Sequence, residues 1–137
     1  MRLVIHTDGG SRGNPGPAAI GVVIIADGVV VAEVAQTIGI ATNNEAEYRA
    51  VLASLEWLVA YDKLATIQNI VWKLDSKLVV EQLSRKWKIK EPRMLSYAQT
   101  AWKHLQSITS QYTFTHIPRE ENSAADALVN QALDAAE

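Results

Sequence analysis

The chain has 137 residues, of which 48% are hydrophobic and 20% are charged. We expect one domain over residues 1–137, because a chain of this length and composition can bury a hydrophobic core without the help of disulfide bonds. The absence of cysteine excludes disulfide frameworks, thiolate catalysis and cysteine-ligated metals. The longest apolar run, Ala18 to Ala26, is too short to cross a bilayer, and His6 and Asp8 leave no room for a signal-peptide core. We therefore expect a cytoplasmic monomer without a membrane partner.

The charge balance weighs against a general nucleic-acid binder, because the formal net charge is −2 and the pI is about 5.9. Five of the 13 basic residues nevertheless lie between Arg85 and Arg93, around Trp87. This segment is either a solvated face or a phosphate-binding patch, and the sequence leaves both interpretations open.

The first predicted strand covers Leu3 to Thr7 and ends at the carboxylate of Asp8. A loop rich in glycine and proline follows, from Gly9 to Pro17. Ligands usually bind at the carboxyl ends of strands in open α/β sheets, and glycine lets the backbone approach a ligand closely. We therefore expect Asp8 to lie in the functional site.

The next two predicted strands, Ala18 to Ala26 and Val29 to Thr37, form a hairpin. Asp27-Gly28 stands between them, and this dipeptide is typical of tight hairpin turns. The chain is therefore expected to begin with three antiparallel strands.

A helix is predicted from Thr42 to about Tyr61, because apolar residues recur there at helical spacing. Its start fits a capping box, in which Thr42 caps the helix and Glu45 reaches back to it. Glu47 has no such capping role and lies on the core side of the helix start. Since burying an unpaired carboxylate is costly, we expect a cation beside Glu47.

The second half of the chain alternates strands and helices, which predicts an α/β fold. Asn69 to Leu74 is a strand that ends at Asp75, and the long crossover before it favours parallel pairing with the first strand. The remaining predicted elements are a helix from Ser76, a break at Pro92, a helix from Met94 to about Ser110, a strand from Tyr112 to Ile117, and a helix capped by Asn122 with Asp126 in its first turn.

Four acids stand at the ends of these elements: Asp8 and Asp75 follow strands, and Glu47 and Asp126 lie in first helical turns. If the two strands are parallel neighbours, all four can converge at one sheet edge. Converging carboxylates repel each other and need divalent cations, and oxygen ligands favour Mg²⁺ or Mn²⁺. Two such ions close together promote phosphoryl displacement. Each acid alone also fits a simpler interpretation, as a turn or helix-start residue.

Four motifs occur in order along the chain: DGGSRGNPGP, TNNEAE, LDSKLVV and HIPREENSAADAL. Together they resemble type 1 ribonuclease H over essentially the whole chain. The resemblance implies a five-stranded mixed β-sheet flanked by helices, and Mg²⁺-dependent hydrolysis of the RNA strand of RNA–DNA hybrids that leaves 5′-phosphate and 3′-hydroxyl ends. It also implies that two ions are held by Asp8, Glu47, Asp75 and Asp126, and that the hybrid groove is lined by Asn14, Thr42, Asn43 and Asn44.

Two features depart from the family pattern. Only RKWKIK and a short link stand where many members carry a long basic protrusion, so hybrid binding is expected to be weaker or to need a partner. His116 stands about where some members use an auxiliary histidine, but on a predicted strand end. Two alternatives remain, a non-catalytic hybrid-binding module and a DNA nuclease of the same broad fold. The four intact acids argue against the first, and the GNPGP and TNN motifs argue against the second.

Overall fold

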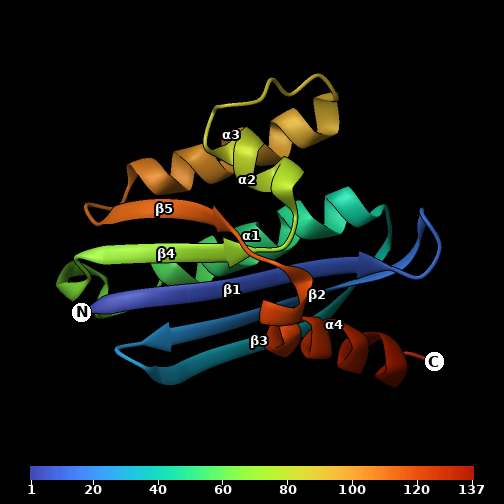
Figure 1. Cartoon of the computed structure of the whole chain (residues 1–137), viewed down its shortest axis with the longest axis horizontal. Coiled ribbons are helices and arrows are strands. Elements are labelled where there is room, and N and C mark those ends of the chain that lie inside the picture. The colour runs from blue at the N-terminus through green and yellow to red at the C-terminus, as the bar shows by residue number, and fades with distance from the viewer.

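A computed structural model describes all of residues 1–137 and contains a five-stranded sheet with the strand order β3-β2-β1-β4-β5 (Figure 1). Strands β1, β2 and β3 pair antiparallel, whereas β1, β4 and β5 pair parallel. The predicted α/β class and mixed sheet are therefore confirmed. The strands are β1 (Arg2–Ser11), β2 (Gly16–Ala26), β3 (Val29–Ala41), β4 (Asn69–Leu74) and β5 (Gln111–His116). The helices are α1 (Asn43–Val59), α2 (Lys77–Leu83), α3 (Pro92–Gln106) and α4 (Ser123–Ala135), with short 3₁₀ turns at Leu64–Thr66 and Arg119–Glu121.

The central strand, β1, is longer than predicted. Its antiparallel ladder with β2 continues to Ser11 and includes both glycines that follow Asp8. Its parallel ladder with β4 stops earlier, at Thr7 opposite Leu74. Asp8 therefore lies inside β1, where the parallel ladder ends, and the prediction that it stands at the strand tip is wrong.

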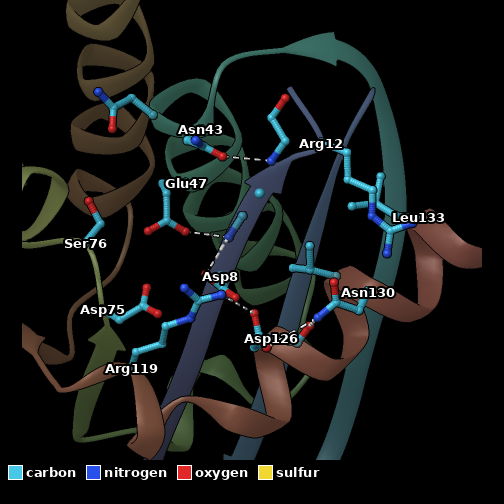
Figure 2. Close-up of a pocket in the computed structure, with 15 residues that line it drawn as sticks. Asp8, Arg12, Asn43, Glu47, Asp75, Ser76, Arg119, Asp126, Asn130 and Leu133 are labelled. Carbon is cyan, nitrogen blue, oxygen red and sulfur yellow. Dashed lines mark hydrogen bonds and ion pairs between the residues drawn. The ribbon is translucent and has the colours of Figure 1, made fainter. Parts of the chain in front are cut away.

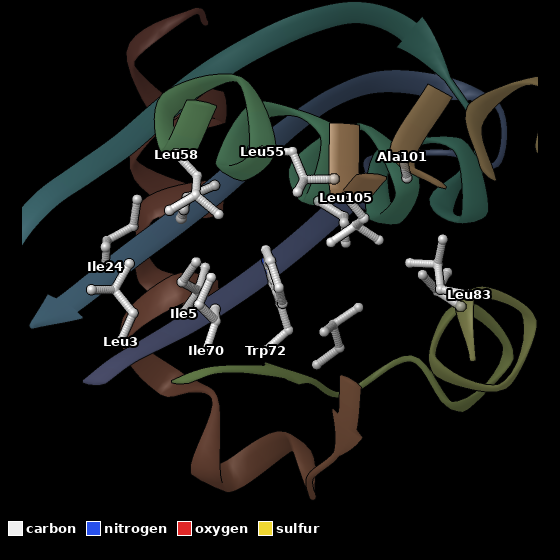
Figure 3. Close-up of a cluster of buried hydrophobic side chains, with 14 of the residues drawn as sticks. Leu3, Ile5, Ile24, Leu55, Leu58, Ile70, Trp72, Leu83, Ala101 and Leu105 are labelled. Atoms are coloured by element: carbon white, nitrogen blue, oxygen red, sulfur yellow. The ribbon is translucent and has the colours of Figure 1, made fainter. Parts of the chain in front are cut away.

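The main core fills the space between one face of the sheet and the helices α1, α2 and α3 (Figure 3). Trp72 of β4 is fully buried and stacks on Phe114 of β5, with ring centroids 5.0 Å apart. Its indole N–H donates to the Ser54 hydroxyl of α1 at 2.9 Å, so the buried polar atoms of both residues are paired. The surrounding side chains include Leu3, Ile5, Ile24, Leu55, Leu58, Ile70 and Leu105.

Helix α4 covers the opposite face of the sheet, over β1, β2 and β3 (Figure 1). Ala19 of β2 packs there against Val129, Ala132 and Leu133 of α4. Because α1 and α4 lie on opposite faces, side chains can reach the middle of β1 from both sides. No helix combines the length and apolar character that a membrane span requires.

Three predicted boundaries are wrong. Strand β3 continues to Ala41, past its predicted end. Pro92 does not interrupt a helix but begins α3, at the first helical position, where its missing N–H costs no hydrogen bond. The Glu91 carboxylate caps this helix by accepting from a first-turn N–H at 2.8 Å. Helix α3 then ends at Gln106 rather than near Ser110.

Candidate active site

Asp8 and Asp75 meet because the parallel strands β1 and β4 end their pairing side by side. Thr7 is the last residue of β1 in register with β4, opposite Leu74. The next residue of each chain segment therefore carries its carboxylate at the same edge. Asp8 is buried, with 7% of its surface exposed, and its Oδ1 accepts from the N–H of Gly9 at 3.0 Å.

Helix α1 adds Glu47 to this pair because Gly9 lets the helix pack directly on β1. A Cβ at Gly9 would lie 2.2 Å from the carbonyl carbon of Ala46, so a larger residue would displace the helix. The buried Glu47 carboxylate accepts from the N–H of Gly9. The cation expected beside Glu47 is not a lysine or arginine, because the protein partner of this carboxylate is a backbone N–H and no basic side chain pairs with it.

Helix α4 brings Asp126 toward Asp8 from the other face, through a second glycine contact. Gly21 lies opposite Asp8 in the antiparallel ladder, and a Cβ there would lie 2.2 Å from the carbonyl oxygen of Ala125. The first turn of α4 therefore rests directly on β2. Figure 2 shows Asp126 on this turn, beside Asp8. The same view shows the side chain of Arg119 next to it, with Nη2 3.7 Å from the Asp126 carboxylate.

The three acids Asp8, Glu47 and Asp75 form a tight, uncompensated cluster, with carboxylate oxygens within 4.8 Å of one another. Burial, and then the charge of Asp75, raise the pKa of Asp8 to about 7. Burial, and then the charge of Asp8, raise the pKa of Glu47 well above its ordinary value. Because no basic side chain pairs with these acids, the all-oxygen cluster fits a hard divalent cation.

The acids line a cavity of about 440 Å³, which also contains Asn43 and Asn44 (Figure 2). A second cavity of about 600 Å³ shares these two asparagines and adds Asn14 and Thr42. All four residues expected to contact the hybrid therefore line a groove that leads to the carboxylates.

Two asparagine side chains join the loop after β1 to the start of α1. The Asn14 Oδ1 accepts from the N–H of Asn43 at 3.0 Å, and the Asn43 Oδ1 accepts from the N–H of Ser11 at 2.8 Å. Since both side-chain oxygens are occupied, the NH₂ groups of Asn14 and Asn43 remain as donors.

The predicted capping box is half correct. Thr42 caps α1, because its hydroxyl accepts from the N–H of Glu45 at 3.1 Å. Glu45 does not reach back to Thr42; its carboxylate accepts instead from Arg93 of α3 at 2.8 Å. The Glu45 carboxylate thus pairs with a basic residue distant in sequence and not with the local backbone N–H, because a charge-assisted hydrogen bond is stronger than one to a neutral donor.

His116 does not line the acidic cavity; it is the last residue of β5 and lies opposite Leu74. Arg119, three positions later, lines the cavity and is the basic side chain that forms an ion pair with Asp126. No sequence pattern marks Arg119, apart from its place in the PRE segment before the last helix.

The basic segment Arg85–Arg93 supplies no residue to the acidic cavity. Arg85 has a left-handed backbone with φ of 62°, and its guanidinium stacks on Trp102, 3.8 Å from the ring centre. Trp87 is 44% exposed, and the Lys77 ammonium lies 6.0 Å from its ring centre. Trp87 is thus outside the core, whereas phosphate binding by this segment stays a prediction.

Asn122 occupies the predicted N-cap position of α4, but its side chain makes no capping hydrogen bond. Its fully buried side chain donates to the carbonyl oxygen of Thr7 at 2.8 Å, and its Oδ1 lies 3.1 Å from the Nδ1 of His6. Asn122 therefore ties the start of α4 to His6 and Thr7, the two residues of β1 that precede Asp8. No local sequence signal reports this contact, because its partners are more than a hundred residues away.

Comparison with known proteins shows the same family along the chain. A family model described as reverse transcriptase-like matches residues 6–132. The bifunctional protein Rv2228c of Mycobacterium tuberculosis is 48% identical over 99% of the chain, and ribonuclease HI of Halobacterium salinarum is 43% identical over 97%. The chain spans 36% and 65% of the length of these two relatives. The crystal structure of LC11-RNase H1 in complex with an RNA/DNA hybrid is 40% identical, covers 98% of both chains and has a TM-score of 0.92.

Proposed function

Since the chain belongs to the type 1 ribonuclease H family, we propose that it is an endonuclease that hydrolyses the RNA strand of RNA–DNA hybrids. The observation that carries this proposal is the cluster of Asp8, Glu47 and Asp75, whose oxygens lie within 4.8 Å of one another in a groove lined by asparagines. The hybrid in the LC11-RNase H1 complex supports the same substrate class.

We propose that two Mg²⁺ ions, or Mn²⁺ in their place, bind at this cluster. Asp8, Glu47, Asp75 and Asp126 would hold these ions with their carboxylate oxygens, and Asp126 would also orient the attacking water. The bound ions would supply the Lewis acidity that activates water and the charge that stabilises the leaving oxygen. The raised pKa values of Asp8 and Glu47 support this assignment, because a divalent cation would favour the ionised carboxylates against the burial and the mutual repulsion that raise these values.

The groove residues suit an RNA-containing duplex. Asn14 and Asn43 present NH₂ donors, since their oxygens accept from backbone N–H groups. Together with Thr42 and Asn44 they would contact phosphate oxygens and 2′-hydroxyls, and the 2′-hydroxyl distinguishes RNA from DNA. The 5′-phosphate and 3′-hydroxyl products follow from attack of water on phosphorus with the 3′ oxygen as the leaving group.

The test uses one end-labelled RNA strand, presented free, paired to RNA and paired to DNA, with a labelled DNA duplex beside it. Each substrate is incubated with Mg²⁺, Mn²⁺ or EDTA. We expect metal-dependent cleavage of RNA only in the hybrid. Asp8→Asn should abolish it, whereas Glu33→Gln should retain it, because Glu33 is an exposed carboxylate on β3, outside the cavity.

Other results would identify the alternatives. Binding of the hybrid without cleavage under either metal would make the protein a non-catalytic hybrid-binding module. Cleavage of the DNA duplex would make it a DNA nuclease. The single-domain organisation over residues 1–137, the cytoplasmic location, the monomeric state and an auxiliary role of His116 stay predictions.

A further inference from the structure

Two acidic side chains, Glu45 and Glu91, stand in the wall of the groove proposed to bind the hybrid. Glu45, the third residue of α1, lines the same cavity as Asn14, Thr42 and Asn43. Its side chain is 11% exposed. A carboxylate in this position opposes the approach of a phosphate backbone, because like charges repel more strongly where water is partly excluded.

Arg93 is the only basic side chain that pairs with Glu45, with Nη1 2.8 Å from the carboxylate. It comes from the first turn of α3, which packs beside α1, and its side chain is 63% exposed. The other acid of this wall, Glu91, precedes α3 and caps it by accepting from the N–H of Met94. Nη1 of Arg93 is therefore paired with Glu45, although most of the arginine side chain stays exposed.

We propose that Arg93 is a positioning residue, which neutralises Glu45 and thereby makes this wall of the groove compatible with a polyanionic hybrid. This inference rests on the proposed function. It differs from the interpretation of the segment Arg85–Arg93 as a phosphate-binding patch, because Arg93 acts through Glu45 and not on the substrate. The two roles make opposite predictions for a variant that lacks both charges.

The experiment is a double-mutant cycle with Arg93→Ala, Glu45→Gln and the combined variant, assayed on a labelled hybrid with Mg²⁺. Arg93→Ala should raise KM about tenfold and leave kcat within about twofold, because an uncompensated charge weakens binding and not the chemical step. Glu45→Gln alone should bind the hybrid at least as tightly as the wild type. The combined variant should return KM to within about twofold of the wild type.

Two further variants separate the roles. Arg93→Lys keeps the positive charge and should rescue most of the loss in KM. Lys88→Ala removes an exposed charge of the same segment that makes no ion pair. Glu45→Gln should change the KM of Lys88→Ala by the same factor as it changes the KM of the wild type, and no more. Thermal unfolding of every variant controls for loss of folded protein.

The salt dependence gives an independent readout. A direct phosphate contact by Arg93 would lower the slope of log KM against log salt by about 1 in both the single and the combined variant. We expect the combined variant to retain the wild-type slope. An unchanged KM in Arg93→Ala, or a combined variant as defective as Arg93→Ala, would overturn the inference. If the wild type itself neither binds nor cleaves hybrid, the proposed function fails first, and the wild-type reactions alone reveal this.

Discussion

Replacing Asp8 by asparagine should abolish cleavage and yet stabilise the metal-free protein. The substitution removes one member of a buried cluster of like charges while keeping a side-chain oxygen that can accept from the N–H of Gly9. Like charges held together by the fold oppose folding, and residues at functional sites often reduce stability in this way.

The magnitude follows from the pKa of Asp8, which rises from 3.8 to about 7 on folding. This rise corresponds to about 4 kcal/mol of unfavourable free energy for the ionised carboxylate in the folded state. Glu47 shares the same repulsion, and the new amide needs hydrogen-bond partners of its own. We therefore expect Asp8→Asn to raise the free energy of unfolding by about 2–4 kcal/mol at pH 8.

The sign of the pH dependence is fixed by proton binding. Between pH 4 and pH 7 the folded wild type keeps the Asp8 proton and the unfolded chain does not, so the wild type loses stability as pH rises through this window. Asp8→Asn has no such proton. Its advantage should therefore be near zero at pH 4, grow up to about pH 7 and then remain constant.

Urea unfolding in EDTA from pH 4 to pH 8.5 measures this difference, with Glu33→Gln as the control for loss of an exposed carboxylate. Adding Mg²⁺ should stabilise the wild type, because an ion that binds only the folded state shifts the unfolding equilibrium, and should not stabilise Asp8→Asn. An Asp8→Asn protein that is less stable than the wild type at pH 8, or an advantage independent of pH, would refute the reasoning.

Three further predictions concern the contacts that support the site. Gly21→Ala forces a Cβ against a carbonyl oxygen of α4 and should lower kcat about a hundredfold, because it displaces the Asp126 carboxylate. In Gly10→Ala the new Cβ meets only a methyl group at 3.4 Å, so this control variant should stay active. Ser54→Ala leaves the buried Trp72 N–H unpaired and should lower the unfolding free energy by about 1–3 kcal/mol in urea titrations. Thr42→Ala removes the cap of α1 and should cost about 1 kcal/mol by the same measurement.

Much of the fold was predictable because its signals are local. Asp27-Gly28 does form the turn of a hairpin between β2 and β3, and Thr42 does cap α1. The parallel pairing of β1 and β4 followed from the length of the crossover between them. The four acids predicted from the motifs line one cavity, and their role as metal ligands stays a prediction.

Two predictions about helix caps failed because the side chains have partners distant in sequence. Glu45 was expected to bond to Thr42 but pairs with Arg93. Asn122 stands at the expected N-cap of α4, but its side chain bonds to Thr7 instead of capping the helix. In each case the sequence offered the polar side chain a local hydrogen-bond partner at the start of its helix. The distant partner prevailed because packing had already brought it close, and a buried polar atom takes the strongest available hydrogen bond.

The sequence by itself determined the type and order of the main elements, and which four acids the motifs mark. Only the tertiary structure decided how these acids meet. Gly9 and Gly21 let α1 and α4 rest directly on neighbouring strands from opposite faces, and so bring carboxylates from separate helices to the middle of β1. The physical reason is that turn, cap and periodicity signals extend over only a few residues. How closely a helix packs on a sheet depends instead on whether a glycine, which has no side chain, faces a backbone that is distant in sequence.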